Sequence, residues 1–287
     1  MNLTRLFVLS AAIGILAGCG KDSTAPVDKQ PGPAGLLRIV NAVPDTASMD
    51  FRFTDVVAGV PNVEFVGLVF RAGTTVAYQR TVPGTHHIRV FMNGGSNDPA
   101  VVSTVMGDLD LSVTDGVAQT LIFYGPSRSQ GQKFLATTDN RPTISAAAGS
   151  IGLRAVNLTA GAVDVYLVPG SALATAASGT PVITNLAPLT AATYITAAVA
   201  GSTSGYTVVV TNAGTTTVVA NTLMPAGTPY QAEVPGVSGP LDPVAGSRIS
   251  GSVFSAFIFP PSVAGSRAPA LPNPGVSLAI DRNPPRP

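Results

Sequence analysis

Leu37-Arg38-Ile39-Val40-Asn41 returns 116 positions later as Leu153-Arg154-Ala155-Val156-Asn157. A second stretch, Met49-Asp50-Phe51-Arg52-Phe53, returns 114 positions later as Val163-Asp164-Val165-Tyr166-Leu167. Polar residues alternate with apolar ones in this second pair, a period typical of a strand with one buried face. Self-similarity at this spacing predicts two copies of one folded unit. The recurring polar positions, to which we assign structural roles, are Arg38, Asn41 and Asp50 in the first copy and Arg154, Asn157 and Asp164 in the second.

The end of each copy carries another recurring motif. Asp139-Asn140-Arg141-Pro142 resembles Asp281-Arg282-Asn283-Pro284, which lies 142 positions later. The second copy is therefore longer by about 28 residues. We place most of them in the Pro/Gly-rich stretch near 224–246 and expect a mobile, mostly structural loop there. The predicted copies span residues 36–142 and 150–284.

The rest of each copy also reads as short strands. Turn signals such as Pro83-Gly84 and Asn93-Gly94-Gly95 separate the apolar and alternating segments, and long helical periodicity is absent from the sequence. We therefore predict an all-β fold of two tandem antiparallel β-sandwiches of immunoglobulin-like architecture. The predicted strands are 63–70, 74–82, 87–92, 118–124, 163–167, 194–199, 206–211, 215–220 and 252–259.

The N-terminus carries an export signal. Leu16-Ala17-Gly18-Cys19 resembles a bacterial lipobox, preceded by the apolar run Leu6 to Leu16 and the positive charge of Arg5. That run is too short to span a membrane, which takes about 20 apolar residues. We therefore expect residues 1–18 to form a lipoprotein signal peptide. In the lipoproteins that this motif resembles, the cysteine is lipidated, so Cys19 is the expected site of the anchor.

The predicted location is the bacterial cell envelope. Residues 19–35 contain charged residues and prolines without hydrophobic periodicity, and we expect a flexible tether between the lipid and the first copy. Gly20 follows Cys19, where lipoproteins retained in the inner membrane have an aspartate. In a host with two membranes this favours the outer one. The predicted membrane attachment is the lipid alone.

Composition restricts the partners. Removal of residues 1–18 takes away Arg5 and no acid, which leaves 15 basic residues against 15 acidic ones. A chain without net charge has no electrostatic attraction for nucleic acid, so we expect no nucleic-acid partner. Cys19 is the single cysteine, and its lipidation leaves no thiol for a disulfide. Stability must then come from apolar burial.

A family resemblance rests on the opening of each copy. Leu37-Arg38-Ile39-Val40-Asn41-Ala42-Val43-Pro44-Asp45, followed by Met49-Asp50-Phe51, resembles the start of the bacterial domain-of-unknown-function family 4397. The second copy has Thr159-Ala160-Gly161 in place of the Pro-Asp turn, yet keeps Val163-Asp164-Val165-Tyr166. The resemblance implies a secreted or envelope-exposed β-domain, often tandem and often lipidated. It implies no known catalytic residues.

Candidate chemistry is sparse. His86 and His87 are neighbours on one predicted strand and point to opposite faces, so we do not expect them to share a metal. Asp108 and Asp110 fall on one face of a strand or loop; this is compatible with a weak calcium site, but we assign them to a solvated edge or turn. Asp50 and Asp164 are expected to accept hydrogen bonds from turn backbone, or to pair with Arg38 and Arg154. Asp139 and Asp281 are expected to end the last strand of each copy in the same way.

The sequence therefore favours a non-catalytic, lipid-anchored envelope protein that displays tandem β-sandwiches for binding or scaffolding, with a protein or a surface polymer as partner. We expect no cofactor, no catalytic residue and no metal site. The alternative is a metal-dependent binding protein or a hydrolase that uses Asp108, Asp110 and either His86 or His87. It requires these groups to converge in one site.

Overall fold

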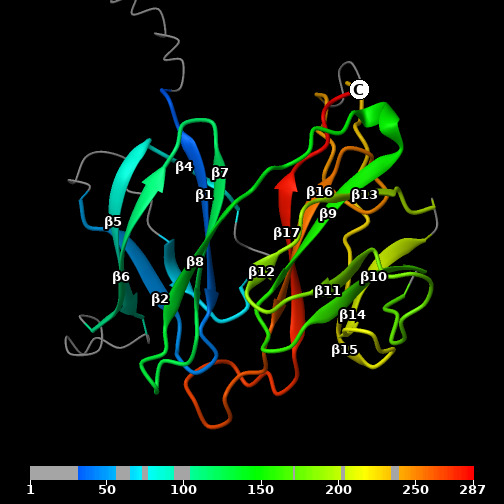
Figure 1. The fold of residues 1–287 in the computed structure, drawn as a ribbon. Coiled ribbons are helices and arrows are strands. Elements are labelled where there is room, and N and C mark those ends of the chain that lie inside the picture. The colour runs from blue at the N-terminus through cyan, green and yellow to red at the C-terminus, as the bar shows by residue number, and fades with distance from the viewer. Residues whose placement is uncertain are drawn as a thin grey trace, which may run out of the picture. The chain divides into compact units, whose positions relative to one another are not determined.

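A computed structural model describes residues 32–55, 65–72, 77–93, 104–170, 172–201, 204–233 and 239–287. Pro33–Pro287 forms one compact unit built of strands, which confirms the predicted all-β class (Figure 1). The predicted signal peptide, Cys19 and most of the tether lie outside the described residues.

The first β-sandwich consists of two four-stranded sheets with the orders β4-β1-β7-β8 and β3-β2-β5-β6. Its strands are β1 (Gly35–Ala42), β2 (Met49–Phe53), β3 (Phe65–Leu68), β4 (Gln79–Thr81), β5 (Gly84–Met92), β6 (Val105–Val113), β7 (Ala118–Tyr124) and β8 (Lys133–Thr138).

The second sandwich follows a single 3-10 turn, η2 (Ala146–Ala148), and repeats this arrangement with the orders β12-β9-β16-β17 and β11-β10-β14-β15; β13 also pairs with β9. Its strands are β9 (Ser150–Asn157), β10 (Val163–Gly170), β11 (Ile183–Leu186), β12 (Thr190–Ala191), β13 (Ile195–Ala198), β14 (Gly205–Asn212), β15 (Val218–Leu223), β16 (Val253–Phe259) and β17 (Gly275–Arg282).

One pair of strands in each sandwich is parallel, whereas the sequence predicted antiparallel sheets. β1 runs parallel to β7 with Arg38 opposite Thr120, and β9 runs parallel to β16 with Arg154 opposite Ser255. A parallel pair needs a long crossover connection, and here the intervening strands of the copy supply it. The first strand of each copy thereby lies inside its sheet, beside a hydroxyl-bearing residue.

Each sandwich has its own apolar core between its sheets. In the first, Phe51 of β2 meets Phe123 of β7 edge to face, with ring centroids 6.0 Å apart. In the second, Val165 of β10 and Phe254 of β16 belong to the corresponding cluster. These are the inward faces that the alternation at Met49 to Phe53 and Val163 to Leu167 predicts.

A third apolar cluster contains residues of both copies. Val40 and Ile122 come from β1 and β7, and Val156, Phe257 and Ala279 come from β9, β16 and β17; each is at most 2% exposed. The sheets that contain the parallel pairs are thus buried on both faces, one face inside its own sandwich and the other against the second copy.

The connection between β15 and β16 contains the Pro/Gly-rich stretch near 224–246. Met224 and Ala245 are buried in the core of the second sandwich. Between them, backbone bridges join Thr228 to Val244 and Gln231 to Leu241. The base of this segment is therefore an integral part of the domain, because its apolar side chains and its backbone both find partners there.

Candidate functional site

A buried polar site lies between the two copies. Two arginines and two aspartates form it, and their side chains are at most 2% exposed. Arg38 lies on β1, Arg154 on β9 and Asp281 on β17, while Asp139 directly follows β8. All four come from recurring motifs of the sequence. We call this group, with the hydroxyl residues described below, the inter-copy network.

The ion pairs of the network cross from one copy to the other. Arg38 Nη1 of the first copy lies 2.6 Å from Asp281 Oδ1 of the second. Arg154 Nη2 of the second copy lies 2.5 Å from Asp139 Oδ1 of the first, an ion pair by distance whose angle is outside that of a hydrogen bond. Arg38 also lies 3.6 Å from Asp139. Two positive and two negative charges therefore neutralise each other away from water, which a buried charge requires.

Hydroxyl groups link each arginine to the aspartate of its own copy. Thr120 Oγ1 accepts from Arg38 Nε at 3.1 Å and donates to Asp139 Oδ2 at 2.5 Å. In the second copy, Ser255 Oγ accepts from Arg154 Nε at 2.7 Å and donates to Asp281 Oδ2 at 2.6 Å. The parallel register places each hydroxyl directly beside its arginine. The two halves of the network thus repeat the same pattern.

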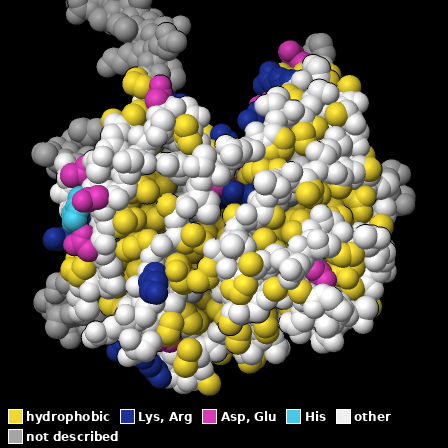
Figure 2. Space-filling view, viewed as in Figure 1, with side chains coloured by type: hydrophobic (Ala, Val, Ile, Leu, Met, Phe, Trp, Pro, Cys, Tyr) yellow, Lys and Arg dark blue, Asp and Glu magenta, His cyan; other side chains and the backbone are white. Residues whose placement is uncertain are grey.

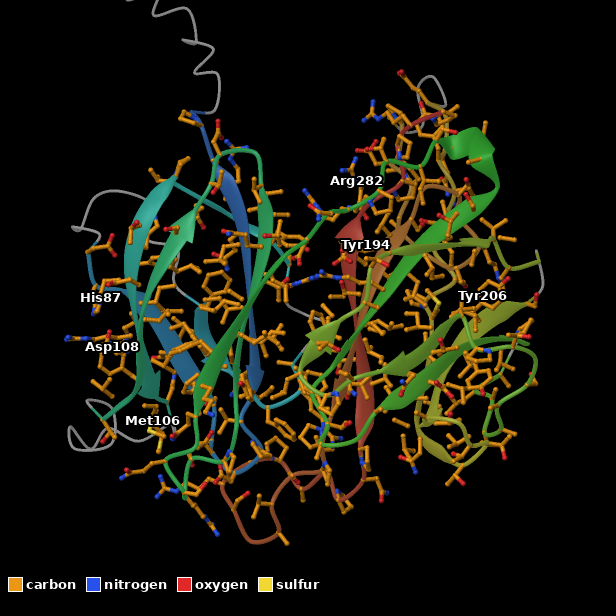
Figure 3. All side chains as sticks on the ribbon, in the orientation of Figure 1. His87, Met106, Asp108, Tyr194, Tyr206 and Arg282 are labelled. Carbon is orange, nitrogen blue, oxygen red and sulfur yellow. The ribbon has the colours of Figure 1, made fainter. Side chains whose placement is uncertain are left out.

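Two tyrosines complete the network. The hydroxyl of Tyr78 donates to Asp139 at 2.6 Å, and that of Tyr194 donates to Asp281 at 2.7 Å. The guanidinium carbons of Arg38 and Arg154 lie 4.4 Å and 5.0 Å from the centroids of the Tyr78 and Tyr194 rings, respectively, within cation–π range. Figure 3 shows Tyr194 beside β17.

Burial and charge both act on the protonation of these groups. Burial raises the pKa of the Tyr78 and Tyr194 phenols well above the ordinary value, and the neighbouring carboxylates raise it further. Burial alone would lower the pKa of Arg154, but Asp139 and the other surrounding oxygens outweigh it and hold this pKa above its ordinary value. Neutral tyrosines and a charged Arg154 are therefore the stable forms.

The network corrects two expectations. Arg38 and Arg154 do not pair with Asp50 and Asp164; their ion-pair partners are Asp281 and Asp139. Asp139 and Asp281 were expected to end the last strand of each copy. Each of them is also the counter-charge of an arginine in the other copy. Sequence reasoning missed the partners Thr120, Ser255, Tyr78 and Tyr194. The tyrosines carried a signal, since they are separated by 116 positions, the displacement of the opening motif.

The recurring asparagines fasten the end of the first strand of each copy. Asn41 donates to Leu68 O at 2.8 Å and accepts from the backbone of Val43. Asn157 donates to Leu186 O at 2.9 Å and accepts from the backbone of Thr159. Both asparagines are at most 1% exposed. The same side chain thus joins the same two elements in each copy.

The recurring aspartates of β2 and β10 hold loops by accepting from backbone N–H groups. Asp50 accepts from Gly67 at 2.8 Å, and Asp164 accepts from Asn185 at 2.6 Å and from Gly214 at 2.8 Å. Although burial opposes it, the hydrogen bonds from Arg52, Asn93 and Gly67 lower the pKa of Asp50. Of the two expected roles, turn binding is therefore the one that these residues have.

A polar cluster on the outer face of β5 and β6 brings together the residues of the alternative function. His87 Nε2 lies 2.8 Å from Asp108 Oδ1, and His87 Nδ1 lies 2.7 Å from Asp110 Oδ1. Arg89 Nε donates to Asp108 at 3.0 Å. The group projects from the exposed face of the first sandwich, where a histidine lies among acidic side chains (Figures 2 and 3). The charged groups of this cluster pair with one another, and the cluster lies on an open sheet surface.

His86 points to the opposite face, as the alternation predicts. It is 8% exposed, lies edge to face against Phe53 with ring centroids 5.1 Å apart, and bonds to Asp55 and to Val82 O. Of the two histidines, only His87 joins Asp108 and Asp110. Within the described ranges, no group of three or more His, Cys, Asp or Glu side chains has the arrangement of a metal site.

A comparison with known protein families identifies a match for the first part of the chain. Residues 35–166 match the family model described as "Domain of unknown function (DUF4397)", which confirms the resemblance carried by the opening motifs. The match runs from β1 through the first sandwich and ends in β10. The curated proteins contain no match to this chain. In the described part of the chain, no helix has the length and apolar character to span a bilayer.

We expect Asp281→Ala to lower the free energy of unfolding by about 3–5 kcal/mol, because it leaves Arg38 buried without its counter-charge. Asp108→Ala is the control, since that carboxylate is exposed and its loss should cost about 1 kcal/mol or less. In a double-mutant cycle, Arg38→Ala with Asp281→Ala should lose less than the sum of the single variants. Urea unfolding measures the four proteins of the cycle and the control, and additive losses within the cycle would contradict the ion pair.

The raised pKa values of Tyr78 and Tyr194 predict a loss of stability in alkali. Their contribution is fully present below the unfolded value of about 10 and declines as the pH rises above it, because the unfolded chain then releases protons that the folded chain retains. Urea midpoints between pH 8 and 11 should fall less in Tyr78→Phe/Tyr194→Phe than in the wild type. If the urea midpoints of the two proteins fall equally with pH, the tyrosines are not the cause of the loss of stability.

Proposed function

We propose that this chain, whose residues 35–166 match the DUF4397 family model, is a non-catalytic, lipid-anchored envelope protein that displays its two sandwiches as one rigid module for binding or scaffolding. The observation that carries the proposal is the pair of crossed ion pairs between the copies. Domains joined in one chain ordinarily move relative to each other unless a large apolar interface holds them. Here a buried apolar cluster and a neutralised ionic network occupy the interface together.

A second connection between the copies supports rigidity. The loop between β16 and β17 contacts the first sandwich through its backbone: Val263 N donates to Pro44 O at 2.9 Å. Arg71 of the first sandwich donates to Asn273 O at 2.5 Å, and Arg128 donates to Gly265 O at 3.1 Å. The copies are therefore joined at positions far apart along the strands, so that rotation at the interface would break both sets of contacts. A fixed spacing between two sandwiches suits a scaffold.

The proposed attachment is the lipid on Cys19, followed by the tether to residue 35. The lipobox-like motif and the absence of another long apolar run in the sequence support it. The partner would be a protein or a surface polymer bound through loops or sheet edges. β15 is an edge strand of its sheet and offers such an edge. In a host with two membranes, we propose the outer membrane.

The alternative function rests on the convergence of His87 with Asp108 and Asp110. The same geometry argues against it, because carboxylate oxygens occupy both ring nitrogens. A histidine needs an unoccupied nitrogen to bind a metal or to accept a proton from a nucleophile. We therefore interpret the cluster as a ladder of charges that protects the edge strand β6 from pairing with other chains.

Mass spectrometry of the membrane-extracted protein tests the anchor. We expect acyl groups on Cys19 and an N-terminus at that residue, with residues 1–18 removed. Cys19→Ser should move the protein from the membrane fraction to the soluble fraction, and the matched control Ser23→Ala, four residues further on, should not. A wild-type protein that is soluble and unacylated would refute the lipid-anchored part of the proposal.

Calcium and zinc titrations test the alternative. We expect neither ion to raise the melting temperature of the wild type relative to His87→Ala or Asp108→Asn, because the cluster satisfies its own charges. Saturable binding of either ion that both substitutions abolish would favour the metal-dependent function. Thermal unfolding in the presence of each ion, and of a chelator, is the measurement.

A further inference from the structure

A cavity lies at one side of the second sandwich, between the edge strands of its two sheets. β15 borders it on one sheet and β17 on the other. Its volume is about 550 Å³, within the range of about 300–1,000 Å³ typical of small-molecule sites. The cavity is separate from the inter-copy network and shares no lining residue with it.

Most of the lining is apolar. Met224 and Leu278 are 2% and 7% exposed and contribute to the floor. Leu223 and Ile280 are 45% and 41% exposed and form the rim. Large apolar side chains left open to water at a concave site mark a place where apolar surface is buried on binding.

One wall of the cavity is formed by the connection between β15 and β16, which is longer than the corresponding connection of the first copy. In the first sandwich four residues separate β6 from β7, whereas 29 separate β15 from β16. Pro225, Ala226 and Arg248 belong to this longer connection and line the cavity. Gly246 fixes the wall, since a Cβ there would lie 2.1 Å from the backbone of Ala226. This wall is therefore a feature of the second copy.

One charged side chain lines the cavity. Arg248 Nε donates to Ser204 O at 2.6 Å, and its backbone N–H donates to Ala226 O, so that the side chain is held against the wall. Its two Nη groups make no hydrogen bond or ion pair with the described residues, and no acidic side chain lines the cavity. An arginine is always charged and offers paired donors that match a carboxylate.

We propose that this cavity binds an amphipathic monocarboxylate, a straight alkyl chain with a carboxylate head. The chain lies against Met224, Leu278 and the rim, and the head accepts from the Nη groups of Arg248. Chemistry decides this class: an apolar cavity favours an alkyl chain, and a single unneutralised guanidinium favours an anion over a neutral or cationic head. The inference does not depend on the lipid anchor or on the scaffolding role.

Isothermal titration calorimetry of the full chain carrying Cys19→Ser, which keeps detergent out of the sample, tests the proposal with octanoate, decanoate and dodecanoate. We expect one site per chain, with each two-carbon extension tightening binding by about tenfold as further methylenes are buried. Arg248→Met should weaken dodecanoate binding about tenfold or more and change the binding of neutral dodecanol by less than about twofold. Arg248→Lys, which keeps the charge, should retain part of the affinity.

Ile280→Trp at the rim should weaken dodecanoate and dodecanol alike, because it narrows the mouth. Val66→Trp, at a similarly exposed position of β3, is the matched control and should change neither. The proposal is wrong if dodecanoate does not bind to the parent chain. It is also wrong if Ile280→Trp leaves dodecanoate binding unchanged. Equal weakening of both ligands by Arg248→Met overturns the carboxylate assignment. If Arg248→Met fails to fold, the binding of dodecanoate and dodecanol to Arg248→Lys and to Ile280→Trp tests the proposal instead.

Discussion

Buried charge must be neutralised, and the described structure of this chain is organised around that constraint. Arg38 and Arg154 lie in the middle of sheets covered on both faces, where an unpaired guanidinium would cost several kcal/mol, on the order of a typical protein's whole stability. Their counter-charges come from Asp281 and Asp139 of the opposite copy. Neither sandwich can satisfy its own arginine fully, so the placement of one copy determines the stability of the other.

The order of the strands makes this possible. Because β1 and β9 each lie inside a sheet and run parallel to β7 and β16, their arginines meet Thr120 and Ser255 in register. Those hydroxyls accept from the arginine and donate to the aspartate, so each of them uses both its acceptor and its donor function. The tyrosines then shield the carboxylates from water while donating to them. An apolar cluster around the network excludes solvent and strengthens each of these interactions.

Strands such as β7 and β14 lie where the sequence predicts them, at 118–124 and 206–211, because the patterns that indicate a strand are local; β6 was not among the predicted strands. The role of Arg38 could not be predicted in the same way. Its partner Asp281 lies 243 residues away, and sequence spacing favours neighbours within one copy. Parallel pairing also escaped prediction, since the alternation is the same in parallel and antiparallel sheets. At the surface, the pattern placed Asp108 and Asp110 on one face, but only the structure shows that His87 joins them and that both nitrogens of its ring are occupied.

Each copy supplies a carboxylate to the arginine of the other copy. A twofold-symmetric dimer has the same reciprocal contacts, in which residue i of one subunit meets residue j of the other and residue j meets residue i. In this protein both halves belong to one chain. A protein with a single copy could neutralise its arginine in the same way only by associating with a second molecule of itself. Such a dimer would come apart on dilution, as its stability would follow protein concentration. Duplication within one chain removes that dependence, and the linker that joins the halves turns an encounter between molecules into a contact within one molecule.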